Sequence, residues 1–154
     1  PECVVALAAR PNSIVGSIVN STMVVECTMN RLFQSGYDIK DIASASGACP
    51  IAPLKTDEPE FMGASLDSIA YYGMAYLYAQ NRNDIFKETI SQFSKSYGKS
   101  FKSLLKDSQG DYSRVDQAMF APARIMVNGI HDGSFETYGR LDPAMLLESY
   151  GLKK

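Results

Sequence analysis

The chain has 154 residues, of which 45% are hydrophobic and 21% are charged, and its formal net charge at pH 7 is −2. This length fits one domain with a hydrophobic core. The nearly balanced charge gives no electrostatic basis for binding nucleic acid or an anionic membrane, and no apolar run is long enough to span a bilayer. We therefore predict a single soluble domain over residues 1–154, with neither nucleic acid nor membrane as a partner.

The three cysteines, Cys3, Cys27 and Cys49, lie far apart in the sequence, and His131 is the only histidine. Zinc sites and disulfide frameworks use ligands in closer, paired spacing, so we predict no metal site. Reduced cysteines are typical of cytoplasmic proteins. Since no signal peptide is visible, we expect a cytoplasmic location.

The chain opens on Pro1 and enters a continuous apolar run over residues 3–9. Such a run predicts a strand buried on both faces. Chain termini are normally polar, so we expect this sequence to be a piece of a longer protein whose amino-terminal part lies elsewhere. A strand with two apolar faces would need cover from that part or from another copy. A second strand is predicted from Ile14 to Val19, interrupted by Gly16.

A helix is predicted next, with Ser21 or Thr22 as its N-cap and Gly36 just beyond its end. Its apolar stripe has helical spacing and consists of Val25, Met29, Leu32 and Phe33. A small-residue strand from Ile42 to Ser46 follows. The prolines and glycine of residues 47–53 then predict an extended loop.

A long helix is predicted from Pro59, a good first helical residue. Its expected apolar face consists of Met62, Leu66, Ile69, Gly73 and Tyr76. Residues 84–107 are more charged. There the spacing of Phe86, Ile90, Phe93 and Tyr97 indicates a further helix, and a short one is expected from Lys99 to Asp107.

Asp132-Gly133 separates two alternating runs, Ala123 to Ile130 and Ser134 to Arg140, which predicts a β-hairpin. Asp142-Pro143 then caps a last helix that Gly151 stops. The predicted fold class is therefore α+β, or mixed α/β, in which a sheet packs with amphipathic helices and the chain ends in a β-hairpin and a short helix.

Several short motifs, taken in order, resemble those of methenyltetrahydromethanopterin cyclohydrolases. They are Gly47-Ala48-Cys49-Pro50-Ile51-Ala52-Pro53, Met62-Gly63 with Asp67, Tyr71-Tyr72-Gly73, Asp116 with Met119-Phe120-Ala121-Pro122-Ala123, Val127-Asn128, and Leu141-Asp142-Pro143 with Ser149-Tyr150-Gly151-Leu152. Chains of that family are about twice as long. The resemblance therefore implies that this chain is the carboxy-terminal half of such an enzyme.

The family hydrolyses the methenyl bridge of a cationic tetrahydropterin to the 5-formyl form, in the one-carbon metabolism of methanogenesis and methylotrophy. The resemblance implies the same activity here, with no metal and no dissociable cofactor. It also implies three kinds of partner: the pterin substrate, the amino-terminal half of the same protein, and further copies in a homo-oligomer. Water must attack an electrophilic carbon, so a carboxylate is needed to take its proton.

The family's catalytic glutamate belongs to an Arg-x-Val-Glu stretch, which Met23-Val24-Val25-Glu26 matches here, so the resemblance assigns catalysis to Glu26. It also implies a set of substrate-binding residues: Asn20, Gly47, Cys49, Pro50, Asp67, Tyr71 and Phe120. By residue chemistry alone, Glu26 also fits an ordinary first-turn carboxylate, Cys49 a packed small residue, and the tyrosines core packing.

This sequence departs from the family pattern at three positions. Met23 and Ala64 replace arginines, and Leu66 replaces an asparagine. Guanidinium groups pair with carboxylates in a way that no other side chain reproduces. These losses leave open a second hypothesis, that of a catalytically inactive relative acting as a pterin-binding or subunit-interaction module.

Overall fold

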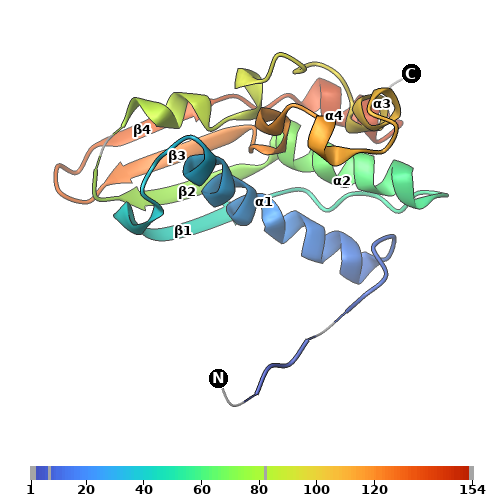
Figure 1. Ribbon diagram of the computed structural model, residues 1–154, viewed down its shortest axis with the longest axis horizontal. Helices are drawn as coiled ribbons and strands as arrows, with labels where there is room; N and C mark the ends of the chain where they lie inside the picture. Colours follow the sequence, from blue (N-terminus) through green and yellow to red (C-terminus); the bar gives the residue numbers. More distant parts are fainter. Residues whose placement is uncertain (1–2, 7, 82, 153–154) are drawn as a thin grey trace.

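The computed structural model describes residues 3–6, 8–81 and 83–152. A four-stranded mixed sheet packs with four α-helices, so the α+β class is confirmed, including the closing hairpin and short helix (Figure 1). The strands are β1 (Ile42–Ala48), β2 (Met74–Ala79), β3 (Arg124–Gly129) and β4 (Phe135–Gly139). The helices are α1 (Ile14–Gln34), α2 (Glu58–Tyr72), α3 (Phe101–Asp107) and α4 (Pro143–Ser149).

The strands lie in the order β1-β2-β3-β4. β1 and β2 are antiparallel, β2 and β3 are parallel, and β3 and β4 form the predicted antiparallel hairpin. Gly133 in the hairpin turn has a φ of +65°, a conformation that favours glycine. A parallel pair requires a long crossover, and residues 80–123 supply it with α3 and several 3₁₀ turns.

The two larger of three apolar clusters among the described residues hold these layers together. The first lies under the sheet, where Leu32 of α1 and Phe86 pack against Leu77 of β2 and Val127 of β3. The second lies beyond the strands, where Tyr71 of α2, Phe101 of α3 and Leu146 of α4 pack together. Figure 1 shows α1 beside β1 and β2 and the other three helices at the far end of the sheet. Side chains in the crossover therefore come close to both α1 and α2.

The predicted strand over residues 3–9 is wrong in its described part, because residues 3–6 and 8–9 belong to no strand. Val4 and Val5 are exposed, and Figure 1 shows this segment leaving the body of the protein. The described residues of this run pair with no strand of the sheet, and a strand is stable only when its backbone groups are paired.

The predicted strand from Ile14 to Val19 is also wrong, because these residues form the first turns of α1. Ser13 is the N-cap, and its Oγ accepts a hydrogen bond from the Gly16 amide at 3.0 Å. The Ser17 hydroxyl donates to the Ala52 carbonyl at 2.7 Å. A good cap and this tertiary bond outweigh the local strand preference of β-branched residues. Gly36 follows the helix with a φ of +86°, as predicted.

The helix predicted from Pro59 is confirmed as α2, but its extension to Tyr76 is wrong. Helix α2 ends at Tyr72, Gly73 is the C-cap, and the chain continues into β2. Apolar residues at positions 73–79 satisfy both helical and strand patterns, and periodicity cannot separate the two in short runs. Similarly, β1 continues through Ala48, so the predicted loop of residues 47–53 begins only at Cys49.

The helix predicted around Phe86 to Tyr97 is wrong as well, because the structure has only two 3₁₀ turns there, Asp84–Glu88 and Ser91–Phe93. Buried hydroxyl groups explain the difference. The Ser91 hydroxyl donates to the Ala70 carbonyl, and the Ser94 hydroxyl donates to Asp116. These bonds to α2 and to the end of the crossover hold the chain in a conformation other than a continuous helix. The two short helices predicted near Lys99 and after Asp142 are confirmed as α3 and α4.

Candidate active site

A largely apolar hollow of about 600 Å³ lies between α1 and the crossover, and we call it the Glu26 hollow. Glu26 is its only charged lining residue. Helix α1 contributes Met23, Glu26, Cys27, Asn30 and Gln34, and the crossover contributes Tyr112, Ser113, Gln117 and Phe120. Two of the predicted site residues, Glu26 and Phe120, thus meet here although 94 positions separate them in the sequence (120 − 26).

The orientation of α1 places Glu26 in this hollow. Val24 and Thr28 are buried against the rest of the protein, so Glu26, midway between them in the sequence, lies on the opposite side of the helix and is exposed. Met23 lies one turn before Glu26 on the same side. Among the described residues, no hydrogen bond or ion pair engages the Glu26 carboxylate. Its carboxylate is therefore available to a ligand, and no guanidinium orients it.

The two cysteines near this hollow are poor nucleophiles. Burial, with Glu26 as the second cause, raises the pKa of Cys27 to about 11. Burial, with Cys27 as the second cause, raises the pKa of Cys49 to about 12. Both groups are therefore protonated thiols near neutral pH, whereas the thiolate is the reactive form. Cys49 also donates a long hydrogen bond to the Pro50 carbonyl at 3.6 Å.

Two other predicted residues support the hollow from behind or beside it. A Cβ on Gly47 would lie 2.6 Å from Cγ1 of Val24, so the absence of a side chain lets β1 approach α1 closely. Asn20, two positions before Thr22 on α1, donates to the sulfur of Met62 at 3.8 Å and to Ser65 at 3.5 Å. Gly47 and Asn20 therefore position α1, and neither lines the hollow.

Asp67 and Tyr71 lie away from the hollow, in the core of α2. Asp67 is fully buried, and its two carboxylate oxygens accept bonds from the Phe101 amide at 2.9 Å and the Ser149 hydroxyl at 2.5 Å. Burial raises the pKa of Asp67 to about 6, although these hydrogen bonds lower it. The Tyr71 hydroxyl donates to the Lys99 carbonyl at 2.6 Å. The structure therefore does not bring either residue to Glu26.

A second hollow of about 600 Å³ lies between α2 and α3, and we call it the α3 hollow. It is lined by Glu58, Pro59, Met62, Lys102, Leu105, Lys106, Gly110 and Tyr112. Tyr112 lines both hollows, so they are neighbours. Ala64, one of the positions where the resemblance expects an arginine, is buried and lines another hollow, of about 370 Å³, beside Glu60 and Glu148.

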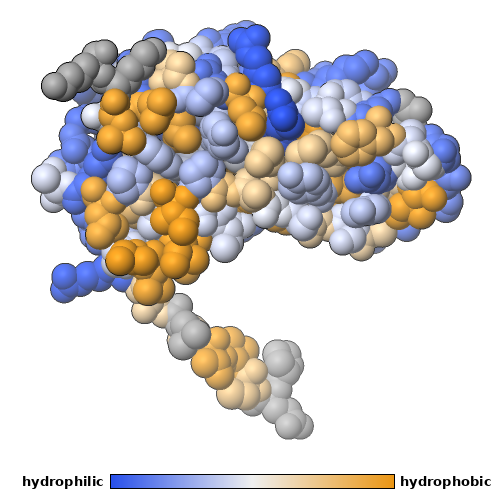
Figure 2. Space-filling view, turned by 180° about the vertical axis from the view of Figure 1, so that it is seen from behind, coloured by the Kyte–Doolittle hydropathy of each residue, from blue (hydrophilic) through white to orange (hydrophobic). Residues whose placement is uncertain are grey.

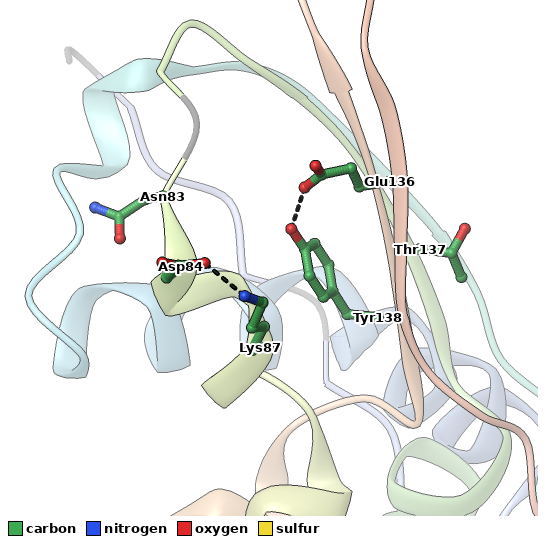
Figure 3. A pocket seen from close by; sticks show the side chains of 6 residues that line it. All are labelled: Asn83, Asp84, Lys87, Glu136, Thr137 and Tyr138. Carbon is green, nitrogen blue, oxygen red and sulfur yellow. Dashed lines mark hydrogen bonds and ion pairs between the residues drawn. The ribbon is translucent and has the colours of Figure 1, made fainter.

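Figure 3 shows a further hollow, of about 530 Å³, between β4 and the 3₁₀ turn at Asp84. Lys87 pairs with Asp84 at 2.6 Å, and the Tyr138 hydroxyl donates to Glu136. It contains none of the predicted site residues. His131 lies in the exposed turn of the hairpin, as its position in the sequence suggests. Within the described residues, no three side chains of His, Cys, Asp or Glu gather in an arrangement that could hold a metal ion.

Comparison with known proteins identifies the family to which this sequence belongs. Residues 1–150 match the family model described as Cyclohydrolase (MCH). The chain belongs to this family. It is similar to the methenyltetrahydromethanopterin cyclohydrolase of Methanococcoides burtonii, with 38% identity over 99% of this chain and 49% of that protein. It is also similar to the proteins of the same name from Methanocella arvoryzae, at 37% identity over 98% of this chain and 48% of the relative, and Methanothermobacter marburgensis, at 31% identity over 99% and 49%.

The chain spans about half the length of the curated relatives it matches. Within that half, the recognition from short motifs is confirmed over nearly the whole chain. No helix in the described residues is both long enough and apolar enough to cross a membrane.

Sequence reasoning missed several residues that line the Glu26 hollow. Asn30 and Gln34 lie four and eight positions after Glu26, a helical spacing that could have indicated a polar stripe on α1. Tyr112, Ser113 and Gln117 lie in irregular 3₁₀ turns of the crossover, where no periodic signal exists. Only the tertiary structure brings these turns against α1.

Proposed function

We propose that this chain is the carboxy-terminal half of a methenyltetrahydromethanopterin cyclohydrolase and that it supplies the catalytic carboxylate, Glu26. The observation that supports the proposal is the position of Glu26, the one charged group in a largely apolar hollow next to Phe120. The reaction opens the methenyl bridge to the 5-formyl form in cytoplasmic one-carbon metabolism. It belongs to methanogenesis or to methylotrophy.

Electrostatics favour this site for a cationic substrate. The methenyl bridge is an amidinium-like cation, and Glu26 offers it an opposite charge. Glu26 is exposed in this half of the protein, so the attraction would strengthen once the amino-terminal half excludes water from the site. The faces of Phe120 and Tyr112 offer flat, apolar surfaces for a pterin ring. The hollow would thus hold the ring with its charged carbon towards Glu26.

The chemistry requires one base and one water molecule. Water adds to the methenyl carbon while Glu26 takes one of its protons, acting as a general base. One of the two carbon–nitrogen bonds of the bridge then breaks, and the leaving nitrogen receives a proton from Glu26. The added hydroxyl loses its proton as the carbonyl forms, so one water is consumed and one proton is released. No metal or organic cofactor takes part in these steps.

The amino-terminal half of the protein would form the opposite wall of the site. Exposed apolar side chains support this part of the proposal, since large apolar patches on soluble proteins mark interfaces. They cluster on the first turns of α1 and the loop after β1, as Ile14, Val15, Ile18, Val19, Ile51 and Leu54. Figure 2 shows such side chains gathered where the amino-terminal segment joins the body. The same surfaces support a homo-oligomer.

A Glu26→Gln variant of the full-length protein tests the catalytic role. Glutamine keeps the shape of the side chain but cannot take a proton, so we expect kcat to fall by about a hundredfold or more. KM should rise as well, because the cationic ring loses the carboxylate that attracts it. Loss of methenyl absorbance is the assay. Glu148→Gln, which removes a carboxylate from α4, is the matched control and should retain the rate. A full-length wild-type protein without turnover at any substrate concentration would reject the proposal.

The second candidate function is a catalytically inactive relative that binds a pterin or a partner subunit. It is favoured by the surroundings of Glu26, where Met23 stands in place of an arginine and no cation among the described residues contacts the carboxylate. Under this alternative, the wild-type protein lacks turnover, and Glu26→Gln leaves pterin affinity unchanged. A fall in rate on that single substitution would reject it.

A further inference from the structure

The Glu26 hollow and the α3 hollow are neighbours, and their charged lining residues differ. Tyr112, which is partly exposed, lines both hollows. Helix α1 also contacts the wall of the α3 hollow, since Asn20, which lines neither hollow, donates to the sulfur of Met62 at 3.8 Å. Each hollow has a volume of about 600 Å³. A ligand longer than one ring system could therefore occupy both.

The two hollows differ in the sign of the charge that they offer to a ligand. Among its lining residues the Glu26 hollow has one carboxylate and no cation, whereas the α3 hollow has Lys102, Lys106 and Glu58. Glu60 already pairs with Lys102, so Lys106 is the cation of the α3 hollow that is left for a ligand. Both hollows otherwise have largely apolar walls. A ligand that matches this pattern has a cationic ring at one end and an anionic group at the other.

The two lysines of the α3 hollow are not equivalent. Lys102 forms an ion pair with Glu60, which also raises the pKa of that lysine. Lys106 lies in the last turn of α3, is exposed, and has no hydrogen bond or ion pair with any side chain among the described residues. An ammonium group without a partner is the better donor to an incoming phosphate or carboxylate.

We infer that the α3 hollow is a second subsite, in which Lys106 binds an anionic group on the side arm of the pterin carrier while the ring lies against Glu26. This inference rests on the proposed function for the identity of the ring. It adds a residue that determines which carriers bind, because a carrier without an acidic arm leaves Lys106 without a partner. Lys106 is therefore a specificity residue that takes no part in the chemical step.

Binding measurements on the full-length protein test this subsite without requiring turnover. The two probes are tetrahydromethanopterin, which carries acidic groups on a long arm and lacks the methenyl bridge, and a tetrahydropterin without any acidic group. Lys106→Gln should weaken binding of the first probe by about twofold to fivefold, as expected for losing one exposed charged contact. It should leave binding of the second probe unchanged.

Two further variants complete the test. Lys106→Arg keeps the positive charge and should retain most of the affinity. Lys40→Gln removes an exposed lysine from the 3₁₀ turn before β1, lines neither hollow, and should change nothing. Equal affinity of wild type and Lys106→Gln for the long carrier, or equal weakening for both probes, would overturn the subsite. Absence of binding by both probes would overturn it together with the proposed function. Charge-dependent binding without turnover would instead reject the catalytic proposal alone.

Discussion

The Ser149 hydroxyl donates a hydrogen bond of 2.5 Å to Oδ2 of Asp67, which ties the end of α4 to the buried middle of α2. The other oxygen of the same carboxylate accepts a bond of 2.9 Å from the Phe101 amide, at the first residue of α3. Asp67 therefore links three helices.

This arrangement predicts how stability depends on pH. Burial raises the pKa of Asp67 to about 6 from an ordinary value of 3.8, so the folded protein holds this proton to a higher pH than the unfolded chain does. The contribution of this group to stability is therefore complete below about pH 4 and is lost as the pH rises through about 6. The loss is about 2 to 3 kcal/mol. Urea unfolding between pH 4 and 7 measures it.

The matched variants are Asp67→Asn and Asp107→Asn. Asparagine at position 67 cannot ionise, so this contribution to the pH dependence should vanish. Asp107 is exposed, and its replacement should leave the dependence as in the wild type. A wild-type slope that survives in Asp67→Asn would show that another group causes it.

The second prediction concerns the arginine that Met23 replaces. A guanidinium one turn before Glu26 would orient its carboxylate by a paired hydrogen bond. We expect Met23→Arg to raise kcat of the full-length protein by about threefold to tenfold, because the carboxylate would spend more time in a productive position. Steady-state kinetics on the methenyl substrate measure this.

The control for Met23→Arg is Asn30→Arg, which places the same charge on the other side of Glu26 within the hollow. An equal gain from both variants would point to a general effect of charge and not to orientation. If Met23→Arg lowers kcat, repulsion of the cationic substrate outweighs any orienting effect.

The third prediction concerns the exposed apolar turns of α1. Val15 and Ile18 lie on one helix face, with 58% and 44% of their surface exposed. If this face is an interface, the isolated 154-residue chain should associate at micromolar concentration. Replacing both residues by serine should weaken association by at least about tenfold, because two buried side chains would lose their apolar contacts. Native mass spectrometry and light scattering measure the assembly state.

Phe33→Ser is the control for this prediction. Phe33 lies at the other end of α1 and is 66% exposed, so its replacement removes a similar amount of exposed apolar surface elsewhere. Its loss should leave the assembly unchanged. A wild-type chain that remains a monomer at micromolar concentration would contradict an interface on α1.

The sequence identifies the elements whose signals are local. Asp132-Gly133 predicts the hairpin, Asp142-Pro143 the start of α4, and Gly36 the end of α1, because each depends on a turn or a cap formed within a few residues. Family membership also follows from the sequence, since short motifs in a fixed order need no spatial contact to be recognised.

Tertiary structure decides the rest, because competing local preferences are settled by distant partners. Residues 14–19 have strand-forming side chains but are helical, in part because Ser17 binds the Ala52 carbonyl. The run over 73–79 fits a helix or a strand, and pairing with β1 and β3 makes it β2. The site follows the same principle. The sequence alone indicates Glu26 as the carboxylate, but only the fold places Phe120 and Tyr112 beside it, since a hollow is formed by surfaces that meet in space.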